Sequence, residues 1–580
     1  MELVIAEKPD AAEKIAEFLG CKPVDGAWKS DEFIVIAARG HLLNAWLKGL
    51  NSDKLPATEI YWRETKATRE QLENIKSWFN FHVGKLENII IATDNDREGE
   101  VIGERIYAYL AGNLKKIYIP EKRWYFSALI PSELKRGFDR IRPMDETQLA
   151  QGHARNMADT IIGLNLTKAL TRIFKANFPN LTQGISLGRV QSPLLKYISE
   201  ESGITIRDKP QESTRTESET ECLINFNDFC VEVKCENVEG KDSVELIEFK
   251  EEERTRKQAE KFPNTDDVLS ALPFSPEVSM NILESLYLQG YITYPRTKSH
   301  YVPLDFAEEL EKALKQHVGM RDTFNISHMV QVKKDESKMA IVPTPQGVEA
   351  YTKEGLSTAE RSVLGWLIAR AIRGFAPPLK FKVKVAVFDG FEMEWRTECL
   401  NPHDAIKYIS EKNYPEVQPG EYPILRIERK WERYTISEAY TTFISKSDDR
   451  DLVSWMTIYG LGTEATRHTY PGLLRQRNYT NEENMPTKLG NIVARIIKSI
   501  GLDEYLTARM EDRIAEIERL DELEEFKNYV VEITQEFIEA LEQNSWNIEL
   551  YCPKGHRAGL RNTKFGLLIH CEQCGKFYPV

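Results

Sequence analysis

An apolar run followed at once by four closely spaced acids most constrains how this chain folds. Residues 88–93, NIIIAT, predict a buried strand, and the residues after the acids have apolar side chains at helical spacing. A similar order opens the chain, where LVIA at residues 3–6 precedes a helical pattern that ends at Gly20. Alternating strands and helices predict a parallel α/β sheet whose site lies at the carboxyl ends of its strands.

The four acids are Asp94, Asp96, Glu98 and Glu100. Carboxylates at the end of a buried strand suit Mg²⁺, which is held by one or two carboxylates and keeps waters for substrate phosphates. The simpler alternative is a solvated acidic helix start, which the helix dipole favours. The EKP sequence after the first strand favours the site, because Glu7 extends the acidic cluster and Lys8 adds a cation that can face a phosphate.

Length and charge limit the class of protein. At roughly 150 residues per domain, 580 residues predict about four folded units. The contents of 41% hydrophobic and 29% charged residues are those of a folded globular chain. A net charge of −13 argues against a nucleic-acid binder that works by bulk charge, so any such site is local. The first residues lack a signal-peptide pattern, and no apolar stretch approaches the roughly 18 residues of a membrane helix, so we expect a cytoplasmic protein.

A locally basic segment offers one place for a polyanion. Residues 151–200 are helical in pattern and contain only two acids, Asp159 and Glu200. Their basic residues are Arg155, Lys168, Arg172, Lys175, Arg189 and Lys196. The chain then becomes polar and β-rich near residues 208–260, with further strand patterns at 381–397 and 422–431, before long helices run to about residue 545.

The acids carry the first resemblance to a known family. A Glu after the first strand followed by a DxDxE motif resembles the Toprim domain of type IA and type II topoisomerases, bacterial primases and some nucleases. The resemblance implies a Mg²⁺ site made by Glu7, Asp94, Asp96 and Glu98.

Three segments narrow the resemblance to type IA DNA topoisomerases. SLGRVQ at residues 186–191 and ARNMAD at 154–159 are similar to the DNA-binding segments of that family, and GLGTEAT at 460–466 is similar to its GxGxxAT segment. Arg gives bidentate phosphate contacts and Gln a hydrogen bond, although both residues on a helix are usually only solvated. The DNA-binding residues implied are Arg155, Asp159, Ser186, Arg189, Gln191, Thr466 and Arg467.

The motif ITYPRT at residues 292–297 resembles the active-site motif of this family, which implies that Tyr294 is the nucleophile. A phenol with a pKa near 10 needs a nearby cation, which Arg296 supplies. The resemblance also implies that Lys8 assists the leaving oxygen and that Glu7 transfers protons during resealing. Lys338 stands where relatives usually carry a His, and we include it among the DNA-binding residues. Asn156 replaces a second basic residue of the family motif.

A group of metal-ligand residues ends the chain. Cys552, His556, Cys571 and Cys574 have the spacing C-x3-H-x14-C-x2-C, which suits a closed tetrahedral Zn²⁺ site. Because the first pair is less regular than CxxC, a three-ligand or empty site is the alternative. We expect one structural zinc ribbon that binds DNA as an appendage.

The resemblance implies a multidomain α/β plus α+β fold that forms a ring. We expect a Toprim domain at residues 1–140, a Tyr-bearing domain at 266–399 and a zinc ribbon at 546–580. A helical DNA-binding domain is expected to be split between 141–204 and 440–545. A β-rich hinge domain is expected to be split between 205–265 and 400–439.

The expected activity is relaxation or decatenation of DNA by single-strand cleavage, a 5′-phosphotyrosine link, strand passage and religation. No GxxxxGK[ST] loop occurs, so the reaction is expected to be independent of ATP. The expected substrates are single-stranded and negatively supercoiled DNA, acted on by a monomer near the nucleoid, with a helicase as a candidate partner. A Toprim primase or nuclease would keep the acids and the zinc site without needing Tyr294. A non-catalytic DNA-binding protein would bind DNA without cutting it.

Overall fold

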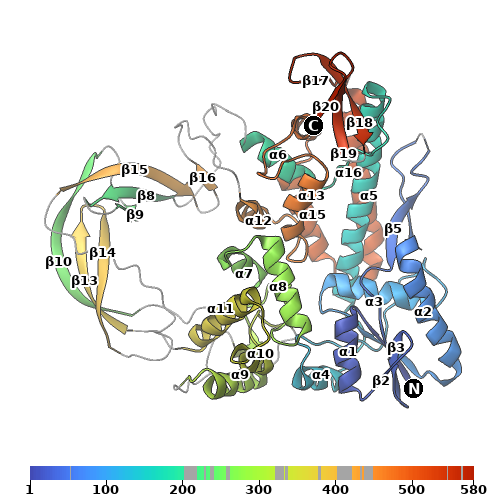
Figure 1. Ribbon diagram of the computed structural model, residues 1–580, viewed down its shortest axis with the longest axis horizontal. Helices are drawn as coiled ribbons and strands as arrows, with labels where there is room; N and C mark the ends of the chain where they lie inside the picture. The colour runs from blue at the N-terminus through green and yellow to red at the C-terminus, as the bar shows by residue number, and fades with distance from the viewer. Residues whose placement is uncertain are drawn as a thin grey trace.

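The structure is a computed structural model of the chain. It describes residues 1–52, 54–201, 218–226, 230–235, 241–255, 261–320, 332–333, 338–376, 380–400, 421–431, 434–436, 448–544, 546–563 and 566–580. Parts of the expected hinge domain therefore lie outside the described residues, namely 205–217, 227–229, 236–240, 256–260, 401–420, 432–433 and 437–439. The described residues form five bodies, of which four surround an opening and the fifth, at the C-terminus, packs on one of the four (Figure 1).

The N-terminal body, residues 1–142, is built on a five-stranded sheet of order β2-β3-β4-β1-β7. Strand β1 pairs in parallel with both β4 and β7, so the carboxyl ends of these three strands lie at one edge. Its sheet strands are β1 (Glu2–Ala6), β2 (Lys22–Val24), β3 (Ala27–Lys29), β4 (Phe33–Ala37) and β7 (Asn88–Ala92). Its other elements are α1 (Pro9–Phe18), the hairpin β5 (Leu43–Lys48) and β6 (Glu59–Glu64), α2 (Lys66–His82), η1 (Val83–Lys85), α3 (Arg97–Leu110) and α4 (Pro131–Phe138).

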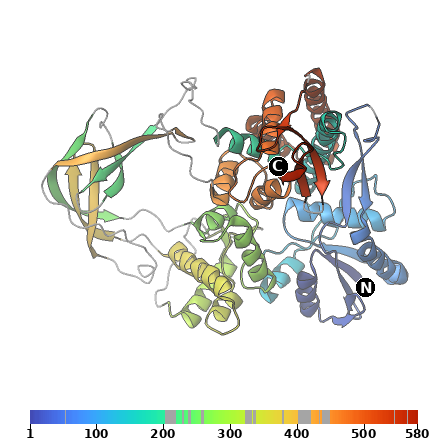
Figure 2. The ribbon, with the colours of Figure 1, turned by 45° about the horizontal axis from the view of Figure 1, so that its top comes forward.

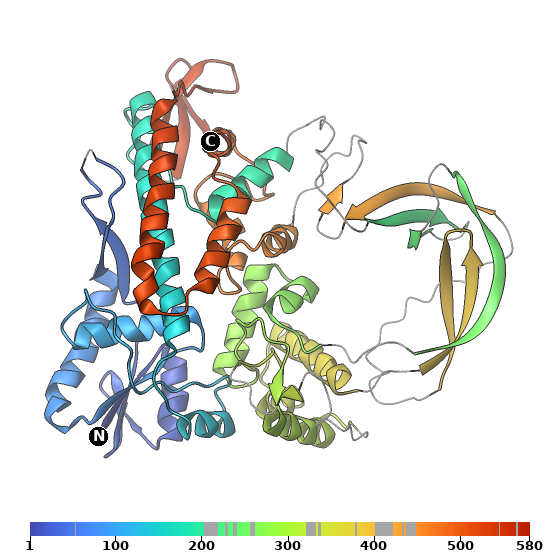
Figure 3. The same cartoon turned by 180° about the vertical axis from the view of Figure 1, so that it is seen from behind.

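The helical body combines residues 146–201 with residues 448–544. Helix α5 has 32 residues and is about 48 Å long at 1.5 Å per residue, and α16 runs beside it in all views (Figure 3). Apolar side chains of both segments share one core, which explains why two distant parts of the sequence form one body. Its elements are α5 (Glu146–Asn177), α6 (Gln191–Glu201), α12 (Asp449–Ile458), η4 (Arg467–Thr469), α13 (Tyr470–Gln476), α14 (Lys488–Ile500), α15 (Glu504–Glu516), η5 (Leu520–Glu522) and α16 (Leu523–Gln543).

The Tyr294 body, residues 261–376, is a small helical unit that packs against the N-terminal body. One core cluster contains apolar residues of both bodies, among them Ala12 and Trp124 of the first and Phe262 and Leu286 of the second. Its elements are α7 (Thr265–Ala271), α8 (Pro276–Leu288), β11 (Val302–Pro303), α9 (Leu304–His317), β12 (Val332–Lys333), α10 (Pro345–Tyr351) and α11 (Thr358–Phe375).

The arch is a seven-stranded sheet that stands apart from the other bodies in all three views (Figure 1, Figure 2, Figure 3). Its strand order is β14-β13-β10-β15-β8-β9, with β16 paired to β15. The chain enters it from the helical body, leaves it for the Tyr294 body and returns through it, so the arch joins the two. Its strands are β8 (Ser218–Asn225), β9 (Cys230–Cys235), β10 (Ser243–Thr255), β13 (Lys380–Phe388), β14 (Phe391–Cys399), β15 (Glu421–Trp431) and β16 (Tyr434–Ile436).

One boundary differs from the sequence expectation. Residues 380–399 were expected within the Tyr-bearing domain 266–399, but β13 and β14 lie in the arch, where β13 pairs with β10 over its whole length. Alternating apolar residues identify a strand but not the strand with which it pairs. The sequence pattern therefore assigned β13 and β14 to the domain that precedes them in the chain.

The C-terminal ribbon, residues 546–580, is a four-stranded antiparallel sheet that packs on the helical body. Its strands are β17 (Leu550–Tyr551), β18 (Arg557–Thr563), β19 (Gly566–Cys571) and β20 (Lys576–Pro579). A search of the described residues found no helix with the length and apolar character needed to cross a membrane.

Candidate active site

The acids meet at the carboxyl edge of the parallel strands. Glu7 follows β1 and Asp94 follows β7, and because these strands are neighbours the Asp94 backbone N–H donates to Glu7 Oε2 at 3.2 Å. Both carboxylates are buried. Asp96 caps α3 by accepting a hydrogen bond from the Gly99 N–H at 2.8 Å. A Cβ atom on Gly99 would lie 2.1 Å from the Asp94 carbonyl oxygen, so glycine is needed for α3 to begin this close to the strand.

A buried ion pair fixes the acidic turn from behind. The fully buried guanidinium of Arg123 lies 3.1 Å from Glu100 and also donates to the Asp94 carbonyl oxygen at 2.8 Å. Glu100, one of the four acids in the sequence, therefore faces away from the acidic edge and serves as the partner of Arg123. Sequence analysis did not identify Arg123, because its segment carries no motif.

The four acids proposed as metal ligands already have protein partners. Lys8 Nζ lies 3.0 Å from Asp94 Oδ2 and 3.8 Å from Glu7 Oε1, and the Tyr294 hydroxyl donates to Asp96. Glu98 Oε1 lies 2.9 Å from His41 Nε2, and this hydrogen bond holds the pKa of Glu98 at about 2.

These partners keep the carboxylates from converging. Within the described residues, the only side chains whose donor atoms gather as a metal-binding group are those of the C-terminal ribbon. Burial raises the pKa of Glu7 well above its ordinary value, and the negative charge of Asp94 raises it further. This edge therefore holds excess negative charge, which is the electrostatic setting for a divalent cation.

Tyr294 comes from the Tyr294 body and points into the acidic edge. Its hydroxyl donates to Asp96 Oδ2 at 2.6 Å, and its backbone N–H donates to the Ser127 carbonyl oxygen at 2.7 Å. Its ring packs edge-on against Tyr287, whose hydroxyl lies 3.5 Å from Asp94 Oδ1. Burial raises the pKa of the Tyr294 phenol, and the charge of Asp96 raises it further, while Arg296 opposes the shift. The phenol is thus neutral in this closed arrangement.

Glu284 of α8 links the two cations of the site. It forms an ion pair with Arg296, and its Oε1 lies 3.9 Å from Lys8 Nζ. Burial disfavours the charged form of Lys8, but Asp94 and Glu7 outweigh it and raise the Lys8 pKa. Burial likewise opposes the Arg296 charge, which the carboxylate of Glu284 stabilises. Sequence analysis missed Glu284, since a single acid on an apolar helix gives no signal.

Lys338 lies between the Tyr294 body and the helical body. Its ammonium donates to Gln148 Oε1 of α5 at 2.5 Å, and no carboxylate pairs with it in the described part of the chain. Burial lowers the pKa of Lys338, and the charge of Asp96 opposes this shift. A half-buried cation with only an amide partner suits an anion that arrives from outside.

The sequence motifs on the helical body form a polar network. Arg155 donates to Thr463 at 2.7 Å and to Thr466 at 3.0 Å, which ties α5 to the GLGTEAT segment. Arg189 is buried and donates to Asp159 and to Glu511, each at 2.6 Å. Two carboxylates therefore already bind the Nε and Nη1 atoms of its guanidinium.

Three further residues of these motifs also have protein partners. Gln191 Nε2 donates to Ser186 Oγ at 3.3 Å, which joins the two ends of the SLGRVQ segment. Arg467 lies 3.1 Å from Asp266 of α7, so the GLGTEAT segment also contacts the Tyr294 body. The structure thus brings these motifs together along one side of the helical body.

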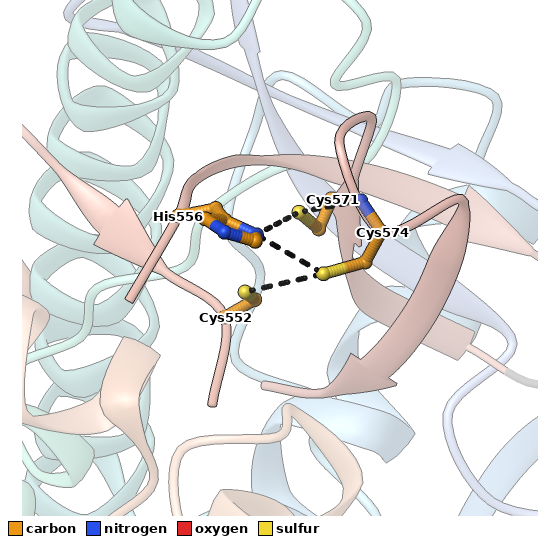
Figure 4. Close-up of side chains that lie close together, drawn as sticks. All are labelled: Cys552, His556, Cys571 and Cys574. Carbon is orange, nitrogen blue, oxygen red and sulfur yellow. Dashed lines mark hydrogen bonds between the residues drawn. The ribbon is translucent and has the colours of Figure 1, made fainter. Parts of the chain in front are cut away.

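The C-terminal ribbon brings its four predicted ligands together (Figure 4). The Sγ atoms of Cys552 and Cys574 are 3.8 Å apart, and His556 Nδ1 lies 3.1 Å from Cys574 Sγ and 3.8 Å from Cys571 Sγ. Two thiolates on a tetrahedral Zn²⁺ with Zn–S bonds of about 2.3 Å lie about 3.8 Å apart, so the donor set fits zinc. The x3 spacing of the first pair is bridged by a tight turn in which the Gly555 N–H donates to the Cys552 carbonyl oxygen.

Comparison with known proteins agrees with this geometry. A family model described as DNA topoisomerase matches residues 143–525, and one described as Toprim domain matches residues 2–129. DNA topoisomerase 1 of Methanocaldococcus jannaschii is 26% identical over 628 residues, which cover 99% of this chain and 78% of that protein. DNA topoisomerase 3 of Staphylococcus aureus (strain NCTC 8325) is 25% identical over 647 residues, which cover 99% of this chain and 85% of that protein.

A solved structure shares the fold. Full-length topoisomerase I from Thermotoga maritima aligns with a TM-score of 0.61 at 22% identity, over 100% of this chain and 97% of the other. At this identity the likeness concerns the fold alone, and it extends to the ring of bodies and the C-terminal ribbon.

Proposed function

The chain belongs to the type IA DNA topoisomerases, and we propose that Tyr294 is the residue that breaks and holds the DNA strand in their reaction. The enzyme relaxes or decatenates DNA by cleaving one strand, passing another and religating the first. One observation carries the assignment of Tyr294: its hydroxyl meets the acidic edge of the N-terminal body although the two lie 198 residues apart in sequence.

The cleavage step transfers a phosphoryl group to Tyr294. The phenolic oxygen loses its proton and attacks phosphorus, the bond from phosphorus to the 3′-oxygen breaks, and a 5′-phosphotyrosine and a 3′-hydroxyl result. The phosphotyrosine keeps the phosphodiester energy, so the strand is resealed without ATP. The raised Tyr294 pKa supports a nucleophile that is silent until DNA phosphate and cations displace Asp96 from it.

Lys8 and Arg296 supply the positive charge for this step. Lys8 would protonate or neutralise the leaving 3′-oxygen, and Arg296 would stabilise the negative charge that builds on the phosphoryl group. Glu7, which is buried and has a raised pKa, would take a proton from the 3′-hydroxyl during resealing. Glu284 keeps both cations at the acidic edge in the absence of DNA.

The acidic edge would hold Mg²⁺ through Asp94 and Asp96, with Glu7 and Glu98 beside them. Bound there, Mg²⁺ would neutralise the carboxylates and hold the phosphate end for religation. Lys8, Tyr294 and His41 must give way for the carboxylates to converge, so metal binding and the closed arrangement compete.

A single DNA strand would run from the acidic edge along the helical body. Arg155 is hydrogen-bonded to Thr466, Gln191 to Ser186, and Arg467 is paired with Asp266, and the strand would contact these side chains and Lys338. Arg189 and Asp159 would act by holding the network in shape, since they already pair with each other.

Further properties follow as parts of the same proposal. The ribbon would hold one structural Zn²⁺ and bind DNA as an appendage. We place the enzyme in the cytoplasm at the nucleoid, as a monomer that acts on single-stranded and negatively supercoiled DNA beside a helicase.

The test is relaxation of a negatively supercoiled plasmid with Mg²⁺ and without ATP, comparing wild type with Tyr294→Phe. Trapping with SDS measures the covalent protein–DNA adduct in the same samples. The proposal predicts stepwise relaxation and a 5′-linked adduct in the wild type and neither in the variant. Tyr291→Phe is the matched control, because this neighbouring tyrosine should leave both signals intact. An adduct that persists in Tyr294→Phe would assign the nucleophile elsewhere.

A further inference from the structure

His468 lies where the helical body meets the Tyr294 body. It belongs to the short helix η4, which packs against α8. Arg467 beside it pairs with Asp266 of α7 at 3.1 Å, and Lys298 pairs with Glu464 of the same segment at 3.4 Å. These two ion pairs fix η4 on the Tyr294 body, so the position of His468 is defined by contacts on both of its sides.

The imidazole of His468 is buried with one ring nitrogen unsatisfied. Only 7% of the residue is exposed, and its Nδ1 has no hydrogen-bond partner among the described residues. Burial and, to a smaller extent, the positive charge of Arg296 lower the pKa of His468 to about 4, so the ring is neutral at pH 7. Leaving a buried ring nitrogen unpaired is unfavourable, which makes the atom a candidate for an absent partner.

Arg296 has a matching unsatisfied atom. Its terminal nitrogen binds Glu284, but its Nε is buried and has no partner in the part of the chain that the structure describes. Arg296 binds Glu284 of α8, the helix against which η4 packs, so both side chains lie at the interface of α8 with η4. Each therefore presents an unpaired nitrogen at one interface, and Arg296 lies two residues after Tyr294.

An acceptor with a negative charge fits these two nitrogens best. The Arg296 Nε can only donate, and the neutral His468 ring can place its proton on Nδ1 and donate as well. The carboxylate of Glu284 already serves another nitrogen of Arg296. A phosphodiester has two non-bridging oxygens and one negative charge, so it can accept from both donors at once.

We propose that Arg296 Nε and His468 Nδ1 together hold one phosphate of the DNA strand next to Tyr294, which makes His468 a positioning residue. This inference rests on the proposed function of Tyr294. His468 would act from the helical body and Arg296 from the Tyr294 body, so the phosphate is gripped only while the two bodies are together. The grip would therefore be released when the Tyr294 body moves away.

The test measures binding of a single-stranded oligonucleotide in a Tyr294→Phe background, where no cleavage occurs. His468→Leu fills the space without a donor, and His468→Asn returns an amide nitrogen near the position of Nδ1. We expect Leu to weaken binding about tenfold and Asn to stay within about threefold of the parent. His82→Asn is the matched control, since His82 is another buried histidine that lies on α2 far from α8.

A series of oligonucleotides with one neutral methylphosphonate each locates the contact. If His468 holds a phosphate, His468→Leu and the methylphosphonate at that one position remove the same contact. Combined, they should then weaken binding by less than the product of the two separate fold losses in affinity. Equal binding by the Leu variant and the parent, or independent losses at every position, would overturn the inference in favour of a buried water or a purely structural histidine. A Leu variant that unfolds is recognised by its Tm. In that case the methylphosphonate series is measured with His468→Asn, and a parental dependence on one phosphate position supports the inference, whereas its absence overturns it.

The outcomes separate this inference from the proposed function. If the protein with Tyr294 intact forms no covalent adduct, the proposed function fails and the inference fails with it. If it forms the adduct and His468→Leu shows no loss that depends on one phosphate position, only the inference fails.

Discussion

The Tyr294 hydroxyl donates a hydrogen bond to Asp96 Oδ2 at 2.6 Å across the boundary between the Tyr294 body and the N-terminal body. Asp96 is a proposed Mg²⁺ ligand and Tyr294 the proposed nucleophile. In this arrangement the hydroxyl of Tyr294 blocks one carboxylate oxygen of Asp96 from a metal ion, and Asp96 keeps the hydroxyl protonated. Lys8 occupies Asp94 in the same way, at 3.0 Å. The closed protein without DNA is thereby held in a state in which neither metal binding nor attack is complete.

This competition predicts that Tyr294→Phe binds Mg²⁺ more tightly than the wild type in the absence of DNA. Removing the hydroxyl frees Asp96 from a charge-assisted hydrogen bond, and we expect the affinity to rise several-fold. Calorimetric titration with Mg²⁺ measures the change, with Tyr291→Phe as the control that should match the wild type. An unchanged or weaker affinity would remove Asp96 from the metal site.

Lys338 predicts a trade between stability and activity. Its cation is half-buried with an amide partner, and desolvation lowers its pKa, so at pH 7 its charge opposes folding. Lys338→Met should raise the Tm by a few degrees and slow oligonucleotide cleavage about tenfold. Lys353→Met is the control, because Lys353 is exposed and pairs with Glu349. Slower cleavage without a gain in Tm would mean that Lys338 is not held under electrostatic strain.

The strand ends and their acids were predictable because their signal is local. An apolar run predicts β1 and β7, and parallel neighbours bring Glu7 and Asp94 to one edge. The four ligands of the ribbon were equally readable from spacing, since metal geometry limits how far apart ligands lie in sequence.

Contacts between bodies were not predictable, because they depend on packing that leaves no local pattern. Glu284, which joins Lys8 to Arg296, is one acid on an apolar helix, and His468 is one histidine in a polar segment. The strands β13 and β14 were visible as strands, but their place in the arch depends on pairing with β10. The basic character of residues 151–200 predicted that Arg189 contacts a phosphate. It did not indicate that Arg189 is buried and paired with Asp159 and Glu511.

The interface of α4 with α9 predicts where the ring can be locked. Ser132 Oγ donates to Glu309 at 3.0 Å, and Arg136 lies 3.2 Å from Asp305. A short reversible cross-link between the cysteines of Ser132→Cys and Glu309→Cys should slow plasmid relaxation at least tenfold. Cleavage of an oligonucleotide should stay intact, because only strand passage needs the bodies to part.

Reductant should restore relaxation, and Ser132→Cys alone should relax normally with or without the cross-linker. Normal relaxation by the cross-linked protein would show that the N-terminal and Tyr294 bodies stay together throughout strand passage.

The ribbon predicts one tightly bound zinc per chain. Cys574→Ser removes a thiolate from the group of four, so metal analysis should find less than a tenth of the wild-type zinc. Cys552 and Cys571 belong to the core shared with the helical body, so zinc loss should also lower the Tm. Cys21→Ser is the control, since Cys21 lies in the N-terminal body. A wild-type protein purified with no zinc and unaffected by chelators would contradict the prediction.

Glu133 of α4, the helix that contacts α9, predicts a pH dependence of protein stability. Burial raises its pKa to about 7, against an ordinary value of 4.5, even though Arg136 lies 2.8 Å away. The folded protein thus holds this proton more tightly than the unfolded chain. This contribution to the free energy of unfolding is fully present below about pH 4.5 and is lost as the pH rises to about 7. Glu133→Gln stays neutral, so its Tm should match the wild type near pH 5 and exceed it by a few degrees at pH 8. Asp139→Asn, at an exposed carboxylate, should show no such divergence in thermal unfolding. A Glu133→Gln difference that is constant from pH 5 to pH 8 would mean that Arg136 keeps Glu133 ionised throughout.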